Sequence, residues 1–180
     1  MWAPSFCYHN GIFYINFTAN DTHKTYLLTA NDPAGPWNKR TIEGFYYDSS
    51  LFFDDDDRVY IVHGQGKLYV TELDSEVKGP LAGGLDRLIV QDEESVVLGY
   101  EGSHLYKKDG RYYLFTCHGL AYGNKWKTED CFIADSLTGE FRGKCIIDDD
   151  MGYHRLGVAQ GGMVDTPAGD WYAFMYQDRG

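Results

Sequence analysis

Residues 100–115, YEGSHLYKKDGRYYLF, contain a carboxylate near their start and two apolar-aromatic runs with a polar turn between them. Two such runs joined by an Asp-Gly pair, here Asp109-Gly110, are typical of a β-hairpin. Glu101 then stands at the entrance of the first strand, beside an aromatic ring and a glycine that lets a ligand approach the backbone. Such a carboxylate can exchange a proton at a pocket mouth. Most isolated glutamates at strand ends are only solvated, so the rest of the chain decides between these interpretations.

The same plan of strand, polar turn and aromatic strand recurs along the chain. Aligning the segments on the turn brings four tyrosines into register, at intervals of about 46, 53 and 59 residues, which is in the range of propeller blades: Tyr14, Tyr60, Tyr113 and Tyr172. An array of antiparallel blades explains a repeating unit better than a sandwich does. The sequence therefore predicts an all-β chain with one domain, blade-like repeats at 1–40, 41–92 and 93–150, and an incomplete repeat at 151–180.

Length and composition narrow the class of protein. A chain of 180 residues fits one domain, and its 16% aromatic residues and 21 glycines suit strands and turns. The net charge of −11 argues against nucleic acid or an anionic membrane as a partner. No apolar run approaches the ~20 residues that span a bilayer. The N-terminus lacks the pattern of a signal peptide, which leaves both a cytoplasmic and a secreted location open.

Two groups of residues could suggest a metal, and neither pattern is complete. The four aspartates at 54–57 are followed by Arg58 and Val59, where a calcium loop of the EF-hand type needs a ligand and a glycine, so a solvated turn is the better interpretation. The four cysteines are widely spaced without a Cys-x-x-Cys pair, which gives zinc no support. We expect free buried thiols, with a contact between Cys117 and Cys131 left open, and no cofactor.

Asp48 occupies the same place in its repeat as Glu101 does in the next one. In a propeller the innermost strands surround a shared axis, so residues at their entrances converge on one cavity. Each carboxylate follows an aromatic residue and precedes a Ser-containing apolar run. Taken alone, Asp48 could equally be a turn or capping residue. Its match to Glu101 favours a shared site.

At these residues the chain resembles the five-bladed propellers of glycoside hydrolase family 43, the β-xylosidase and α-L-arabinofuranosidase group. The resemblance covers nearly the whole chain and rests on four motifs in the right order: residues 2–5 (WAPS), 47–52 (YDSSLF) with 54–60, 101–107 (EGSHLYK), and 157–162 (GVAQGG) with 169–172 (GDWY). It implies an inverting hydrolase that works with three carboxylates. Glu101 looks like the general acid, and Asp48 looks like the residue that raises the pKa of the acid and orients it.

The chain departs from the family pattern at two places. The family's general base is an aspartate upstream of the Trp2 segment, so the resemblance implies a chain truncated at both ends, covering about blades two to four and the start of blade five. A family histidine near a central metal is not evident, because Ala159 and Gln160 occupy its neighbourhood, and a structural calcium therefore lacks support. Trp2, Tyr47 and Gln160 are candidate substrate-binding residues, although the two aromatic rings could equally pack between blades.

Three functions remain in competition. The first is an inverting glycosidase for β-xylosides or α-L-arabinofuranosides of hemicellulose, with a xylo- or arabino-oligosaccharide as partner and the base missing from the chain. The second is a non-catalytic propeller that only binds carbohydrate. The third, a retaining enzyme for fructosides, fits less well because its nucleophile and acid must both be present and close. Open strand edges at both ends predict self-association or dependence on a missing segment.

Overall fold

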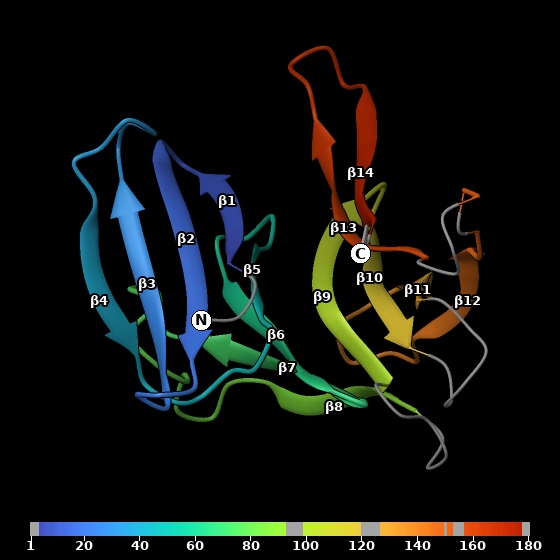
Figure 1. Ribbon diagram of the computed structural model, residues 1–180. Coiled ribbons are helices and arrows are strands. Elements are labelled where there is room, and N and C mark those ends of the chain that lie inside the picture. The colour runs from blue at the N-terminus through green and yellow to red at the C-terminus, as the bar shows by residue number, and fades with distance from the viewer. Residues whose placement is uncertain (1–3, 93–98, 120–126, 150, 153–156, 178–180) are drawn as a thin grey trace.

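The computed structural model describes residues 4–92, 99–119, 127–149, 151–152 and 157–177. These residues form fourteen β-strands in four antiparallel sheets and contain no helix (Figure 1). The predicted all-β class is confirmed. Accordingly, this part of the chain has no helix that is long and apolar enough to cross a membrane.

The first two sheets have four strands each, arranged in the order of the sequence. The first sheet consists of β1 (Ser5–His9), β2 (Ile12–Ala19), β3 (Lys24–Ala30) and β4 (Asn38–Ile42). The second sheet consists of β5 (Ser50–Phe53), β6 (Val59–Gln65), β7 (Lys67–Leu73) and β8 (Asp86–Gln91). Each therefore begins with an edge strand and continues through hairpins.

The third sheet repeats this plan, and the fourth has two strands among the described residues. The third sheet consists of β9 (Gly99–Lys108), β10 (Arg111–Gly119), β11 (Lys127–Ala134) and β12 (Arg142–Ile147). The fourth consists of β13 (Val158–Asp165) and β14 (Trp171–Gln177). The four sheets follow one another along the sequence, in agreement with the repeat that the tyrosine spacing predicts.

The predicted hairpin at Asp109-Gly110 is confirmed. The two residues have φ angles of 51° and 75° and join β9 to β10, whose first paired residues are Lys108 and Arg111. Two consecutive left-handed residues match the right-handed twist of the strands on either side. The hairpin fixes the register of β9 on β10, and with it the position of Glu101.

The first strand of each sheet contacts the first strand of the next one, so that β1 contacts β5, β5 contacts β9 and β9 contacts β13. In Figure 1 these strands lie toward the middle of the molecule, whereas β4, β8 and β12 lie toward the outside. The exposed outer strand β12 and the mostly buried first strand β5 agree with this arrangement. The entrances of β5 and β9 are thereby brought together, although they are about fifty residues apart in the sequence.

Two apolar clusters fill the spaces between the sheets. One lies between the first and second sheets and contains Leu27 and Ile61, and the other lies between the second and third sheets and contains Val62, Leu68 and Leu114. These five side chains are completely buried. The alternation along β6 sends Ile61 to one cluster and Val62 to the other, because successive side chains of a strand point to opposite faces.

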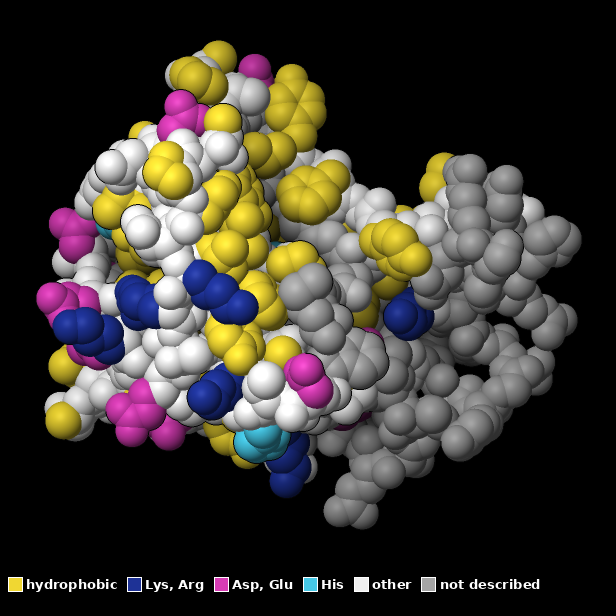
Figure 2. All heavy atoms as spheres, turned by 60° about the vertical axis from the view of Figure 1, so that its left-hand side comes forward, with side chains coloured by type: hydrophobic (Ala, Val, Ile, Leu, Met, Phe, Trp, Pro, Cys, Tyr) yellow, Lys and Arg dark blue, Asp and Glu magenta, His cyan; other side chains and the backbone are white. Residues whose placement is uncertain are grey.

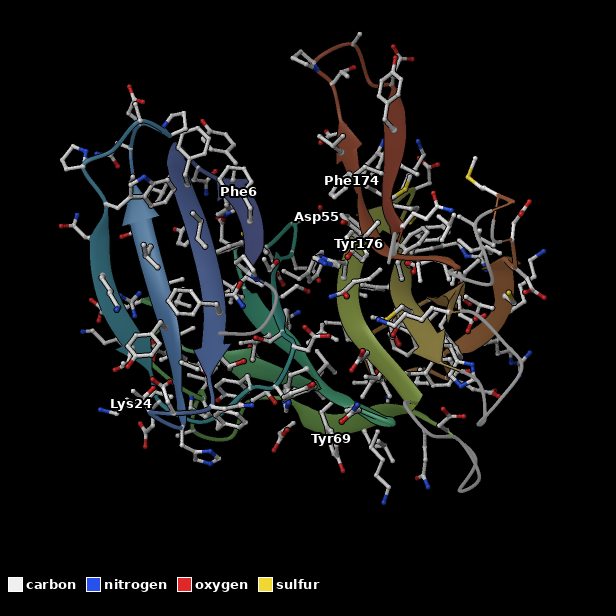
Figure 3. All side chains as sticks on the ribbon, viewed as in Figure 1. Phe6, Lys24, Asp55, Tyr69, Phe174 and Tyr176 are labelled. Atoms are coloured by element: carbon white, nitrogen blue, oxygen red, sulfur yellow. The ribbon has the colours of Figure 1, made fainter. Side chains whose placement is uncertain are left out.

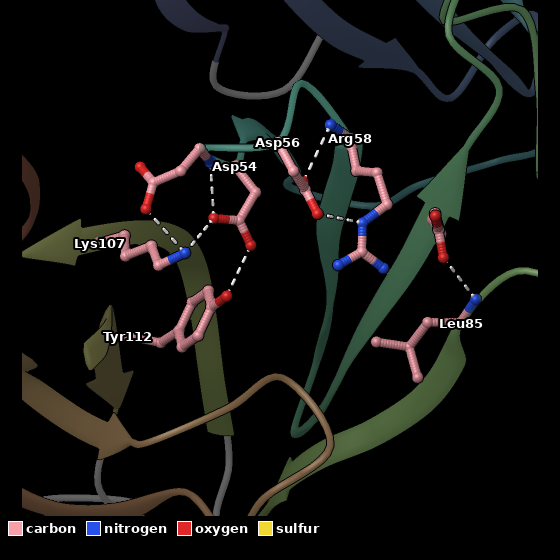
Figure 4. Close-up of polar contacts among 8 residues, drawn as sticks. Asp54, Asp56, Arg58, Leu85, Lys107 and Tyr112 are labelled. Carbon is pink, nitrogen blue, oxygen red and sulfur yellow. Dashed lines mark hydrogen bonds and ion pairs between the residues drawn. The ribbon is translucent and has the colours of Figure 1, made fainter. Parts of the chain in front are cut away.

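The acidic turn at residues 54–57 corrects one prediction. It was expected to be solvated, and Asp55, Asp56 and Asp57 are indeed exposed, but the side chain of Asp54 is only 3% exposed and joins the second sheet to the third (Figure 4). Its carboxylate accepts hydrogen bonds from Nζ of Lys107 at 2.5 Å and from the hydroxyl group of Tyr112 at 2.6 Å. Burial alone would raise the pKa of Asp54, but these hydrogen bonds outweigh it and hold the pKa below the usual value. The neighbouring Asp56 pairs only with Arg58 and is exposed.

We expect Asp54→Ala to lower the free energy of unfolding by about 3 kcal/mol, because it leaves the buried phenol of Tyr112 without its acceptor and Lys107 with only the exposed Asp55 as a partner. In a chain of this size the midpoint Tm in calorimetry should fall by about 6–12 °C. The pKa of Asp54 is depressed in the fold, so the difference between the two proteins should be complete above about pH 4 and shrink as the pH falls through the lower pKa. Asp56→Ala serves as the control. An equal loss in both variants would contradict the assignment.

Exposed aromatic side chains lie on the first and the fourth sheets. Five of them are more than half exposed: Phe6 and Tyr8 on β1, and Tyr172, Phe174 and Tyr176 on β14. Figure 3 labels three of them on these two sheets. Figure 2, turned so that the first sheet comes forward, shows a band of hydrophobic side chains with most of the charged side chains beside it. Groups of exposed aromatic side chains such as these are typical of an interaction surface.

Candidate active site

Glu101 is the third residue of β9 and is 8% exposed. This position agrees with the strand entrance that the sequence predicts. Side chains from two other strands hold the backbone around it. The hydroxyl group of Thr116 on β10 donates to the carbonyl oxygen of Glu101 at 2.7 Å, and that of Ser50 on β5 donates to the carbonyl oxygen of Ser103 at 2.6 Å. The direction in which the Glu101 side chain leaves the strand is therefore fixed from both sides.

Asp48 lies two residues before β5 and is also 8% exposed. Its φ angle of 47° is in the left-handed region, which aspartate adopts more readily than most residues do. The carboxylate accepts a hydrogen bond from the backbone N–H of Gly102, the residue that follows Glu101. The structure thus brings the two predicted carboxylates together from neighbouring sheets.

Burial is the main cause that raises the pKa of both carboxyl groups, and they differ in the other groups that act on them. Burial is the main cause for Glu101, and the negative charge of Asp48 raises its pKa further, against the opposing effects of Lys127 and Gln65. Burial also raises the pKa of Asp48, but the N–H group of Gly102 and the charge of Lys127 act in the opposite direction. Because Asp48 has a backbone donor for its anion, it should ionise first and leave the proton on Glu101. The arrangement can therefore keep one carboxyl group protonated beside a carboxylate.

Gln65 was missed as a site residue in the sequence. The segment Gly64-Gln65-Gly66 reads as a turn, but Gln65 is the last residue of β6, and its Nε2 donates to Oε2 of Glu101 at 3.1 Å. A lone glutamine between glycines carries no sequence signal for such a contact. Only the packing of β6 beside β9 reveals it.

Of the three predicted substrate-binding residues, two are described. Tyr47 is half-buried, and its pKa is raised by burial and then by the charges of Glu101 and Asp48, so it lies beside the carboxyl pair. Gln160 on β13 is half-buried as well and reaches the same place: a Cβ atom added at Gly102 would lie 2.7 Å from its Cγ. Trp2 lies outside the described residues. The role of all three in sugar binding stays a prediction.

Two further residues share the face of Glu101 across the third sheet. Cys117 on β10 pairs with Glu101 on β9, and Glu129 on β11 pairs with Cys117 on its other side. Residues that are directly opposite in neighbouring strands point to the same face. Glu129 is completely buried, and burial is the main cause that raises its pKa to about 8. The described cysteine side chains are all free thiols, and Cys145 is exposed, unlike the buried Cys117 and Cys131.

The described residues do not offer a metal site. They contain no cluster of three or more histidine, cysteine, aspartate or glutamate side chains that could hold an ion. Calcium takes 6–8 oxygen ligands, mostly carboxylates and carbonyl groups. Near Ala159 the described side chains offer the Gln160 amide and the single carboxyl group of Glu129, which is fewer oxygen ligands than calcium takes. The predicted lack of a cofactor stays a prediction.

Comparison with known proteins agrees with this geometry. The family model "Glycosyl hydrolases family 43" matches residues 1–180. A xylosidase/arabinosidase from Butyrivibrio fibrisolvens is 32% identical over 210 residues, which cover 99% of this chain and 38% of the relative. Among solved structures, a bifunctional GH43-CE protein from Bacteroides eggerthii has 36% sequence identity and a TM-score of 0.85, over 98% of this chain and 22% of that one.

A second solved structure gives the same result at lower identity. The xylan β-1,4-xylosidase from Bacillus halodurans has 25% sequence identity and a TM-score of 0.77, over 99% of this chain and 38% of that one. The chain thus spans well under half the length of these relatives, and the solved relatives are β-propellers.

Proposed function

Because this chain belongs to glycosyl hydrolase family 43, we propose that it forms part of a glycosidase that cleaves β-xylosides, α-L-arabinofuranosides or both in plant hemicellulose. The relatives whose names mention these activities support the substrate class. The observation that carries the proposal is the hydrogen bond from Gly102 N–H to Asp48, which ties one buried carboxylate to the residue next to another.

In this proposal Glu101 is the general acid and Asp48 keeps it protonated. Glycosidic oxygen is a poor leaving group, so a carboxyl group that still carries its proton near neutral pH accelerates departure of the sugar. Burial and the charge of Asp48 raise the pKa of Glu101 as this role requires. Gln65, which donates to Glu101, would keep the carboxyl group aimed at the substrate.

The general base is proposed to come from outside residues 1–180, in an inverting mechanism. An inverting enzyme activates water with a carboxylate about 6.5–9.5 Å from the acid. Asp48 is tied to the peptide that follows the acid, and Glu129 is completely buried with its Oε2 bound to the backbone N–H of Gln160, so neither fits the role. The relatives are more than twice as long as this chain, which leaves room for the base elsewhere.

For the fold, we propose that the four sheets are blades two to four and the start of blade five of a five-bladed propeller. Contacts between successive first strands support the blade arrangement. The proposed repeat boundaries at 92 and 150 lie between sheets, whereas the one at residue 40 lies within β4, which ends at Ile42. Tyr47, Gln160 and Trp2 would belong to the wall of the central pocket, where aromatic rings can stack on a sugar.

The function is tested on the complete enzyme of which this chain is proposed to form part, by incubating it with chromogenic β-xyloside and α-L-arabinofuranoside and measuring sugar binding by calorimetry in parallel. Turnover with inversion of the anomeric centre supports the proposal, and the preferred substrate identifies the sugar. Binding without turnover would support the alternative, a propeller piece that only binds carbohydrate. A result in which turnover and binding are both absent would contradict both functions.

We also propose self-association through the two terminal sheets. The exposed aromatic side chains on β1 and β14 support it, because apolar surface of this extent is usually covered by a partner. Static light scattering over a hundredfold dilution should give a mass above that of one 20.5 kDa chain, decreasing with dilution. Phe174→Lys should weaken the association. A monomer at every concentration would rule the idea out.

A further inference from the structure

Glu129 on β11 is a completely buried carboxyl group that the proposed mechanism does not use. Its Oε2 accepts a hydrogen bond from the backbone N–H of Gln160 on β13 at 2.8 Å. Its Oε1 has no hydrogen-bond partner among the described residues. A buried carboxyl group that is only partly hydrogen-bonded lowers stability, so a benefit elsewhere should offset this cost.

The residue that Glu129 holds has an unusual backbone. Gln160 has a φ angle of 46°, and it lies where the pairing of β13 with β14 shifts register between Ala159 and Gly161. A left-handed conformation is uncommon for a residue other than glycine and persists where the surroundings fix it. The hydrogen bond to Glu129 supplies such a constraint, because it ties the N–H group of the irregular residue to the neighbouring sheet.

The side chain of Gln160 in turn packs on the residue beside the proposed acid. A Cβ atom at Gly102 would lie 2.7 Å from Cγ and 2.9 Å from Cδ of Gln160, so only a glycine leaves room for this contact. Gly102 follows Glu101 and donates its N–H to Asp48. Gln160 therefore covers the peptide that connects the two carboxyl groups.

We propose that Glu129 is a positioning residue for Glu101: it fixes Gln160 in its left-handed conformation, and Gln160 covers Gly102 and keeps water away from the acid. The role rests on the proposed function of Glu101. In this proposal Glu129 acts on Glu101 although the two residues are distant in the sequence and Glu129 does not contact the substrate.

The charge state of Glu129 suits this role. Burial is the main cause that raises its pKa to about 8, with Asp130 adding to the rise and the N–H group of Gln160 opposing it. At neutral pH it is therefore an uncharged acceptor. The charged groups that act on the pKa of Glu101 are Asp48 and Lys127. Cys117, which lies between Glu101 and Glu129 in the sheet, has its pKa raised by burial, so its thiol stays neutral.

The test measures the pKa of Glu101 directly, by NMR of protein with ¹³C-labelled glutamate carboxyl groups, so it needs no turnover. Glu129→Leu removes the acceptor and should lower the pKa of Glu101 by about 0.5–1 pH unit, because Gln160 moves and water reaches the acid. Glu129→Gln keeps an acceptor oxygen and should retain the wild-type pKa. Gln160→Ala keeps the peptide N–H but removes the cover, and should lower the pKa as Glu129→Leu does.

Glu72 on β7 offers a matched control. It is also buried on the third strand of its sheet, and its Oε2 accepts from the backbone N–H of Leu85 at 3.0 Å (Figure 4). Glu72→Leu should lower stability without moving the pKa of Glu101. An equal shift in Glu72→Leu, or an unchanged pKa of Glu101 in folded Glu129→Leu, overturns the proposal. If Glu129→Leu does not fold, an unchanged pKa in Gln160→Ala overturns it instead.

The outcome is separable from that of the proposed function. A complete enzyme that does not hydrolyse glycosides, together with a pKa shift of Glu101 in Glu129→Leu and not in Glu129→Gln, would keep the positioning role and lose the enzymatic one. An active chain without the shift would keep the enzyme and lose the role of Glu129.

Discussion

Glu101→Gln should lower kcat on unactivated xylo- or arabino-oligosaccharides by about 10²–10⁴-fold, the usual contribution of a general acid. Glutamine keeps the size of the side chain and can still contact Gln65, but it has no proton to give to the leaving oxygen. A nitrophenyl glycoside, whose leaving group needs less protonation, should lose much less. The measurement is a comparison of initial rates on the two substrate types for both proteins.

The control for this variant is Glu72→Gln, which makes the same change at a buried glutamate of the second sheet. Its rates should equal those of the wild type on both substrates. Two results would contradict the assignment of Glu101. One is a loss that is the same for good and poor leaving groups, and the other is an equal loss in Glu72→Gln.

Asp48→Asn should move the alkaline limb of the pH profile of kcat/KM to lower pH and lower the rate at pH 7 by about 10-fold. The charge of Asp48 raises the pKa of Glu101, so without this charge Glu101 loses its proton at a lower pH and the acid form disappears earlier. A shift of about one pH unit corresponds to about 1.4 kcal/mol of interaction between the two groups. Asparagine tolerates the left-handed conformation that residue 48 adopts.

Asp57→Asn is the matched control, because Asp57 also has a left-handed φ angle, of 62°, and lies beyond the other end of β5. It contacts His9 and Asn10 and loses the same charge on substitution. Its pH profile should coincide with that of the wild type. If the alkaline limb of Asp48→Asn stays at the same pH as in the wild type, burial alone holds the proton on Glu101.

Several features could be predicted from the sequence because short-range patterns determine them. The Asp109-Gly110 turn depends on two residues that accept positive φ angles, and with the strand alternation it placed Glu101 at the entrance of β9. The pairing of Asp48 with Glu101 followed from their matching places in successive repeats. The all-β class followed from the same repeat.

Other features depend on packing between segments that are distant in sequence, and the sequence carried little signal for them. Gln65 looks like a turn residue until β6 and β9 are seen together. Asp54 looks solvated within its acidic turn until Lys107 and Tyr112 reach it from the next sheet. Glu129 required the strand register, because only the pairing through Cys117 puts it on the face of Glu101.

The most direct test of the central claim is the titration of the Glu101 carboxyl carbon by NMR in the wild-type chain, assigned by its loss in Glu101→Gln. Our account predicts an apparent pKa clearly above the ordinary glutamate value of about 4.3, because burial and the charge of Asp48 both favour the protonated form. It also predicts a lower value in Asp48→Asn. A wild-type Glu101 that titrates at or below about 4.3 would contradict the account, because the carboxyl group would then have no proton to donate near neutral pH.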